Sequence, residues 1–217
     1  MSLLSTKNLV FLNMIRYPDL EIPQGKTVFI SGESGCGKST LLRLFNGTLS
    51  PSSGTIMLHD TDISALNPIE LRRQILLAAQ STFLFDDTIR SNFARFYTYR
   101  DLAAPSDNTI GKWLKLCCAD FSPDTACASL SGGERQRVYL SLFLSFAPLA
   151  LLLDEPTSAL DSATSRSLLG NLKEFCSNQG ITLIIVSHDQ QLIQNFADTI
   201  ITLEKGGVPC RESLSCS

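Results

Sequence analysis

The sequence predicts an α/β fold with a parallel β-sheet, and three observations indicate it. Apolar runs of strand length alternate with stretches of helical pattern, as in strands joined by helical crossovers. The runs "LALLLDE" (149–155) and "ITLIIVSH" (181–188) are largely apolar, which is typical of parallel strands covered on both faces. A glycine-rich segment at 32–40 separates an apolar run from a helical one, as phosphate-binding loops do.

Several of the expected strands lie within the first 80 residues. Residues 3–31 are expected to form short strands, including "NLVFLNMI" and, after the turn "PQGK", "KTVFIS". A helix is expected within 37–47, and "SGTIMLH" (53–59) is expected to be a strand because turn signals flank it. We expect a further helix over 63–75 and a buried strand over 75–80.

From about 81 to 130 strand runs disappear, and the helical candidates "TIRSNFARF" and "NTIGKWLKLCCADF" replace them. A longer helix follows a pair of glycines and runs to about 146. A helix at about 162–177 is expected between the two buried strands, and "DTIITLEKG" (198–206) is expected to close the sheet. We therefore interpret residues 81–130 as a helical insertion in the α/β fold.

Composition and charge exclude several classes of function. The chain has 217 residues, enough for one sizeable domain, and its net charge of −3 argues against a nucleic-acid-binding surface. Its seven cysteines are odd in number and form no CxxC pair, which favours reduced thiols. Neither of the two histidines stands near a cysteine pair, so no zinc site is expected. The start of the chain lacks signal-peptide features and the most apolar segment (140–153) is too short to span a bilayer, so we expect a soluble chain.

The segment "GESGCGKST" matches the phosphate-binding pattern G-x-x-x-x-G-K-[ST] between a strand and a helix. Its backbone N–H groups and the helix N-terminus can bind phosphate oxygens. Lys38 adds a positive charge for the β- and γ-phosphates, and the Ser39 hydroxyl can ligate Mg²⁺. The expected nucleotide-binding residues of this loop are Gly32, Glu33, Ser34, Gly35, Cys36, Gly37, Lys38, Ser39 and Thr40. The Cys36 thiol has two interpretations, a reactive group at a helix N-terminus or a tolerated small residue.

Two acidic residues, Asp154 and Glu155, follow a buried strand at the end where open α/β sheets hold their ligands. Asp154 fits the second half of a Mg²⁺ site, and Glu155 can activate an attacking water. A strand that simply ends at solvent would also carry charges, but the phosphate loop favours the functional interpretation. His188 follows another buried strand, where it is either a surface residue or a neighbour of the γ-phosphate.

The stretch "LSGGERQ" (130–136) has a capping-box pattern, with Ser131 as the cap and Glu134 three residues later. Gly132 and Gly133 stand between them, although glycine is about 1 kcal/mol poorer than alanine in a helix. A helix start alone does not need two glycines, so we expect another group to approach this turn closely.

Together, "GESGCGKST", Gln80 after a buried strand, "LSGGE" and "LLLDEPTSALD" followed by "SHD" resemble the ATP-binding cassette (ABC) ATPases over nearly the whole chain. The resemblance implies ATP and Mg²⁺ as cofactors. It implies a P-loop NTPase with a RecA-like core, a small antiparallel β-subdomain and an inserted α-helical subdomain, all within a single domain of residues 1–217. The core and β-subdomain would comprise about 1–80 and 147–217, and the helical subdomain about 81–146.

The resemblance also implies roles for the matching positions. Gln80 is similar to the glutamine that contacts Mg²⁺ and water and senses the membrane partner, although the residue alone is equally a plain loop residue. Ser131, Gly132 and Gly133 are similar to the signature that binds ATP held by the opposite subunit of a dimer. Glu155 is similar to the catalytic base.

Two further segments complete the implied set. Residues 158–161, "SALD", resemble the loop that links the two ATP sites of the dimer, and His188 resembles the switch histidine. Lys38 joins the implied catalytic residues through its phosphate contacts. The family stacks an aromatic ring on adenine, and here Phe11 is the best candidate and Tyr17 a poorer one, because the loop between the opening strands is short.

Residues 83–93, "FLFDDTIRSNF", resemble a stretch of exporter-type cassettes, which are commonly fused to a membrane domain. Because no segment of this sequence is long enough to span a bilayer, we expect the membrane part to be an integral membrane permease on a separate chain. The nearby aromatic residues Phe93, Phe96, Tyr97 and Tyr99 either line the groove that receives this partner or pack the helical subdomain. A stand-alone cassette of this kind is similar to bacterial ATPases of iron export.

The sequence thus predicts the ATP-hydrolysing subunit of an ABC transporter, with export as the suggested direction. Two copies, or one copy and a paralogous subunit, would close over two ATP molecules and drive the permease from the cytoplasmic face of the cell membrane. No nucleic-acid partner is expected. One alternative is a soluble ABC ATPase of DNA repair or translation, which generally carries two cassettes or long insertions. Another is a nucleotide-binding regulator, which usually lacks a motif that this chain retains.

Overall fold

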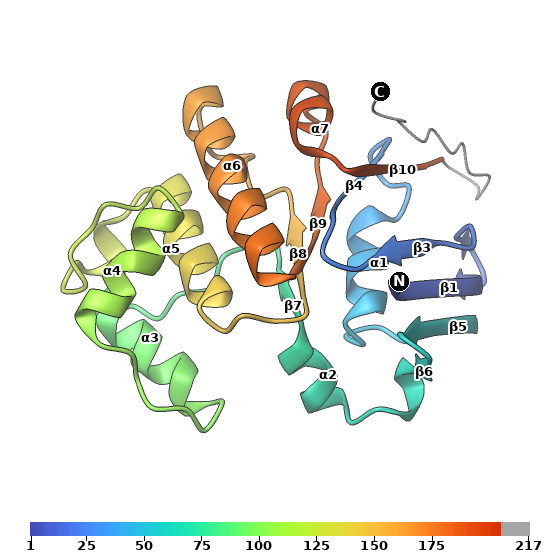
Figure 1. The fold of residues 1–217 in the computed structure, drawn as a ribbon, viewed down its shortest axis with the longest axis horizontal. Coiled ribbons are helices and arrows are strands. Elements are labelled where there is room, and N and C mark those ends of the chain that lie inside the picture. The colour runs from blue at the N-terminus through green and yellow to red at the C-terminus, as the bar shows by residue number, and fades with distance from the viewer. Residues whose placement is uncertain (205–217) are drawn as a thin grey trace. The chain divides into compact units, whose positions relative to one another are not determined.

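The computed structural model describes residues 1–204 and has an α/β fold with one antiparallel and one parallel sheet of five strands each (Figure 1). The α/β fold class is confirmed. By compactness the chain divides into two units. The first comprises Met1–Leu77, Pro148–Glu155 and the chain from Lys173 onward, and the second comprises Ala78–Ala147 and Pro156–Leu172.

The antiparallel sheet has the strand order β2-β1-β5-β6, with β3 also paired to β1. Its strands are β1 (Ser2–Phe11), β2 (Ile15–Arg16), β3 (Glu21–Pro23), β5 (Ser53–Leu58) and β6 (Thr61–Asp62). The turn from β1 to β2 is tight because Leu12 and Asn13 both have positive φ, 50° and 56°, and Met14 N donates to Phe11 O. Two consecutive positive φ angles match the twist of a hairpin.

The parallel sheet has the order β10-β4-β9-β8-β7. Its strands are β4 (Thr27–Gly32), β7 (Ile75–Ala78), β8 (Ala150–Asp154), β9 (Thr182–Val186) and β10 (Thr199–Leu203). Every residue of β8 and β9 is buried, as expected for parallel strands with both faces covered. In register, Val186 lies beside both Ile30 and Asp154. The loops that follow β4, β8 and β9 therefore leave the sheet at the same edge.

The helices are α1 (Lys38–Phe45), α2 (Pro68–Gln74), α3 (Ile89–Thr98), α4 (Asp107–Leu116), α5 (Gly132–Leu144), α6 (Ser162–Gln179) and α7 (Gln190–Phe196). Two 3₁₀ turns, η1 (Ile63–Ala65) and η2 (Cys127–Ser129), precede α2 and α5. Within residues 1–204, no helix combines the length and apolarity needed to cross a membrane.

A single hydrophobic cluster joins the two sheets of the first unit through α1. It includes Leu4 of β1 and Ile56 of β5, Leu42 of α1, and Ile30 and Leu152 of the parallel sheet, all at most 1% exposed. Fully burying one such side chain contributes roughly 1.5–3 kcal/mol. This core fixes the start of α1 at the edge where the parallel strands end.

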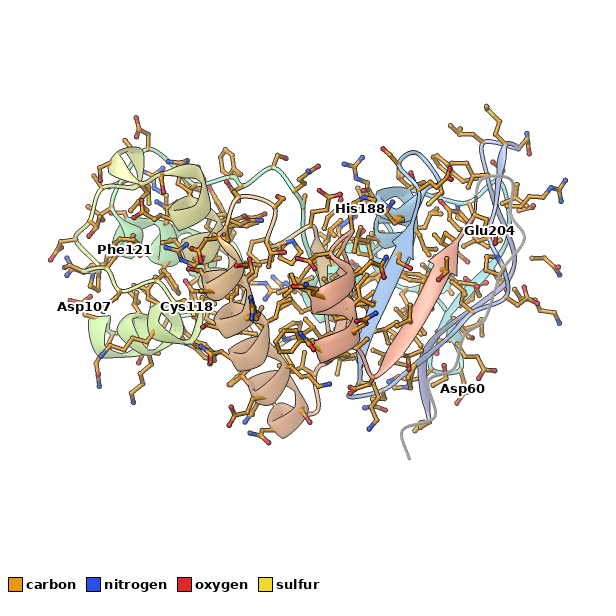
Figure 2. All side chains as sticks on the ribbon, turned by 90° about the horizontal axis from the view of Figure 1, so that it is seen from above. Asp60, Asp107, Cys118, Phe121, His188 and Glu204 are labelled. Atoms are coloured by element: carbon orange, nitrogen blue, oxygen red, sulfur yellow. The ribbon has the colours of Figure 1, made fainter. Side chains whose placement is uncertain are left out.

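In the helical unit, the Arg90 guanidinium of α3 donates two hydrogen bonds of 2.7 Å to the Asp107 carboxylate at the start of α4, and it also contacts Asp124. Figure 2 shows Asp107 and Cys118 near the two ends of α4. The helices predicted between residue 81 and about residue 146 are confirmed, because α3, α4 and α5 lie in this range.

Two local predictions were wrong or incomplete. The helix expected over 63–75 is interrupted, because the Asn67 side chain accepts hydrogen bonds from Ile69 N and Glu70 N and starts α2 at Pro68. Asparagine as cap followed by proline is a strong signal for the start of a helix, and it outweighs the helical pattern of residues 63–66. Helix α7 was not expected, and the capping oxygen of Asp189 starts it. Residues 205–206 of the predicted closing strand lie outside the described residues.

Candidate active site

The loop between β4 and α1 depends on three glycines, Gly32, Gly35 and Gly37, whose φ angles are 144°, 80° and 97°. A Cβ atom on Gly32 would lie 2.2 Å from Leu203 O, so no other residue fits there. Gly37 is the N-cap of α1 and supplies no side-chain cap. The first N–H groups of α1 are therefore left for a ligand, and their partial positive charge favours an anion.

Lys38 is 6% exposed and curls back over its own loop. Its Nζ atom donates to Gly32 O at 2.9 Å and to Glu33 O at 2.8 Å. A buried ammonium needs such partners, and a phosphate at the loop would supply charged ones. Cys36 is also 6% exposed and belongs to the hydrophobic core cluster, which favours its interpretation as a small packing residue.

The Ser39 hydroxyl donates to Asp154 Oδ1 at 3.0 Å, which joins the start of α1 to the end of β8. Asp154 is 6% exposed. A hydroxyl and a carboxylate oxygen side by side are the hard oxygen ligands that Mg²⁺ prefers, and they lie beside the phosphate loop. The residues present therefore fit a Mg²⁺ site.

Glu155 and His188 meet at the same edge of the sheet. His188, labelled in Figure 2, lies after β9, and its Nε2 atom is 3.2 Å from Glu155 Oε1. Glu155 has a left-handed φ of 52°, and its N–H donates to Val186 O at 3.1 Å. A non-glycine residue held in this conformation costs about 1–3 kcal/mol, and such residues cluster at functional sites. Both side chains are partly exposed, so water can reach them.

The two aromatic candidates for adenine stacking lie differently. Phe11 pairs with Ile15 across the β1–β2 hairpin, so the two side chains share a face. Ile15 Cγ2 lies 3.2 Å from the position that a Cβ of Gly37 would take, which places this face beside the phosphate loop. Phe11 is partly buried there, whereas Tyr17 is 5% exposed. Phe11 is therefore the more accessible of the two rings, and adenine stacking on it stays a prediction.

In the second unit, the capping box at the start of α5 is complete. Glu134 N donates to Ser131 Oγ at 3.4 Å, and Ser131 N donates to Glu134 Oε2 at 2.7 Å. The two glycines between them differ in surroundings. A Cβ on Gly132 would meet nothing within 4 Å, whereas a Cβ on Gly133 would lie 2.7 Å from Ala159 O. Gly133 thus accommodates the 158–161 loop, and Gly132 faces open space.

The core unit brings together the phosphate loop, Asp154, Glu155 and His188. Gln80 is exposed two residues beyond β7 and belongs to the second unit, as do Ser131, Gly132 and Gly133. Sequence reasoning did not foresee one contact of the loop, the hydrogen bond from Tyr17 Oη to Gly37 O at 2.9 Å. Nothing in the sequence marks this contact, because the two residues meet only through the fold.

The chain matches the family model described as ABC transporter over residues 15–158. It is 37% identical to the "Probable iron export ATP-binding protein FetA" of Escherichia coli, a match that covers 83% of this chain and 80% of the relative. It is 34% identical to the "Methionine import ATP-binding protein MetN" of Mannheimia succiniciproducens, covering 90% of this chain and 58% of that relative.

The fold is also similar to solved structures of ATP-binding cassettes. The dimeric post-hydrolysis state of the ATP-binding cassette MJ0796 bound to ADP and Pi superimposes with a TM-score of 0.87 at 27% identity, over 99% of this chain and all of that one. A bacterial Atm1-family ABC exporter with ATP bound superimposes with a TM-score of 0.86 at 29% identity, and the match covers 97% of this chain and 38% of the exporter.

Proposed function

This chain belongs to the ABC transporter family of ATP-binding subunits and is an ATPase, and from this premise we propose which of its residues hydrolyse ATP and what it drives. The observation that carries the proposal is the convergence, at one edge of the parallel sheet, of the phosphate loop, the Ser39–Asp154 pair and the Glu155–His188 pair. These are the parts that phosphoryl transfer to water requires.

In this proposal the backbone N–H groups of residues 32–40 and the Lys38 ammonium hold the phosphates of ATP. Ser39 and Asp154 would hold Mg²⁺, which would neutralise negative charge on the phosphates. Glu155 accepts a proton from the attacking water, and His188 orients the Glu155 carboxylate. Phe11 covers the adenine.

We further propose that the active form is a dimer in which the signature of one subunit completes the site of the other. Support comes from Gly132, which is exposed and has open space where a Cβ would lie, and from the dipole of α5, which favours an anion at this end. Gln80 would contribute to the Mg²⁺ site from its exposed position. The partner subunit is a second copy or a paralogue.

The membrane partner is proposed to be a permease on a separate chain, contacted through an aromatic surface of the helical unit. Phe83 and Tyr99 are 58% and 68% exposed, and both pack against Phe85. Phe96 also contacts Phe85 and Tyr99, so the exposed rings rest on a packed base. The chain would then lie peripherally on the cytoplasmic face of the membrane, with the stretch 83–93 favouring an exporter-type permease.

Two measurements test this function. If a dimer completes the site, ATP hydrolysis per chain should rise with protein concentration, and a rate that is constant over a wide range would contradict the dimer. Affinity capture from detergent-solubilised membranes should recover an integral membrane protein, and its recovery should fall for Phe83→Ser/Tyr99→Ser. Capture of none under conditions that preserve other transporters would argue against the transport function.

A further inference from the structure

Tyr17 is buried beneath the phosphate loop and reaches it with a single polar atom. The residue lies between β2 and β3, its N–H donates to Leu9 O at 2.9 Å, and its ring belongs to the hydrophobic core cluster. Burial raises the pKa of Tyr17 above its usual range, so the phenol keeps its proton and remains a hydrogen-bond donor.

The phenol contacts both ends of the first turn of α1. Its hydroxyl donates to Gly37 O at 2.9 Å, and the Thr40 side chain hydrogen-bonds the phenol oxygen. Gly37 O also accepts the first bond of the helix, from Leu41 N at 2.8 Å. No side chain caps this helix at its N-cap residue, Gly37. The hydrogen bond from Tyr17 therefore fixes the Gly37 carbonyl by a contact that comes from another part of the chain.

The fit between the phenol and Gly37 is close. A Cβ on Gly37 would lie 2.7 Å from Tyr17 Oη, and Gly37 already has a φ of 97° that other residues rarely adopt. The phenol therefore restricts the backbone conformation of the phosphate loop at Gly37, where the loop enters α1. A binding loop that is held in its bound path loses less conformational freedom when the ligand arrives.

We propose that Tyr17 is a positioning residue of the nucleotide site, which holds the Gly37 carbonyl and the Thr40 hydroxyl in the arrangement that binds the phosphates of ATP. The proposal rests on the function proposed above. It predicts that the hydroxyl of Tyr17 acts on ATP affinity and leaves the chemical step to Glu155 and His188.

The test is Tyr17→Phe in the full chain, which removes the hydroxyl and keeps the ring. Losing one neutral hydrogen bond should weaken ATP binding and raise KM by roughly two- to tenfold, with kcat nearly unchanged. Tyr139→Phe is the matched control, because Tyr139 is also buried but lies in α5 of the helical unit. It should leave Kd and KM for ATP as in the wild type.

Three outcomes separate the possibilities. An unchanged Kd and KM in Tyr17→Phe, with ATP binding by the wild type, would overturn the role of Tyr17 and leave the proposed function intact. A lower Tm and kcat with unchanged KM would show a purely structural residue and would also overturn it. A wild-type chain that binds no ATP would contradict the proposed function itself.

Discussion

The Nε2 atom of His188 lies 3.2 Å from Oε1 of Glu155, although the two residues follow different strands of the parallel sheet. Neighbouring strands β8 and β9 end in register, with Asp154 beside Val186, and this register brings the two loops together. The contact makes the two side chains one catalytic unit in the mechanism proposed here, so their substitutions should not act independently.

For Glu155→Gln we expect ATP binding to persist while kcat falls at least about 100-fold, because removing a general base typically costs that much or more. The substituted chain should accumulate as an ATP-bound dimer, which size-exclusion chromatography with ATP would detect. Glu174→Gln, at an exposed position of α6, is the control and should hydrolyse ATP like the wild type. Turnover at the wild-type rate in Glu155→Gln would remove Glu155 from the mechanism.

For His188→Ala we expect a drop in kcat of about tenfold or more with little change in ATP affinity, because in the proposed mechanism His188 orients Glu155 and does not hold the nucleotide. In the Glu155→Gln background the same substitution should cost little more, since residues that act as a unit are not additive. Steady-state kinetics of the four proteins measure this coupling. Full additivity of the two losses would show that the residues act separately.

For Lys38→Ala we expect the loss to appear in ATP affinity, with a Kd at least about tenfold higher, because charged hydrogen bonds to phosphate are lost. The chain should still fold, since alanine is compatible with the first turn of α1. Lys26→Ala, at an exposed position of the turn before β4, is the control for removing a positive charge. Equal ATP binding by Lys38→Ala and wild type would refute the role of Lys38.

The two glycines of α5 should respond differently to alanine. Gly133→Ala places a Cβ 2.7 Å from Ala159 O and should lower Tm by displacing the 158–161 loop. Gly132→Ala has open space, so Tm should stay equal or rise slightly, while ATPase activity should fall because, in the proposed dimer, the new methyl group would face the partner's nucleotide. Thermal unfolding and ATPase assays on both proteins check this, and identical behaviour of the two would contradict the assignment.

A pH dependence of stability is expected from Asp198, which contacts Lys173 Nζ at 2.7 Å and accepts from Thr27 N at 2.8 Å. Burial opposes ionisation of Asp198, but the hydrogen bonds from Lys173 and Thr27 outweigh it and hold the pKa below its usual value. The stabilisation is therefore present above about pH 4 and is lost as the pH falls through the folded-state value.

Thermal unfolding between pH 6 and 3 should thus show a shallower acid loss for Asp198→Asn than for the wild type, together with a lower Tm at pH 6. Lys173→Met should weaken the same dependence, because it removes one of the two donors. An unchanged acid profile in both proteins would show that this ion pair does not contribute.

The sequence by itself determined the features that depend on local order along the chain. Alternating apolar runs identified the buried strands, and the spacing of Gly32, Gly37, Lys38 and Ser39 identified the phosphate loop, because both signals are local. The capping box of Ser131 was predictable for the same reason. The start of α2 is also encoded locally, by Asn67 as the cap and Pro68 as the first helical residue.

Only the tertiary structure decided which residues meet. The contacts of His188 with Glu155, Ser39 with Asp154 and Tyr17 with Gly37 join residues that are 33, 115 and 20 positions apart in the sequence. Such pairs depend on strand register and on packing over α1, which no local pattern encodes. The difference between Gly132 and Gly133 also depends on the tertiary structure. Whether a side chain fits at either position is set by the atoms that its Cβ would meet, and only the fold brings Ala159 close to Gly133.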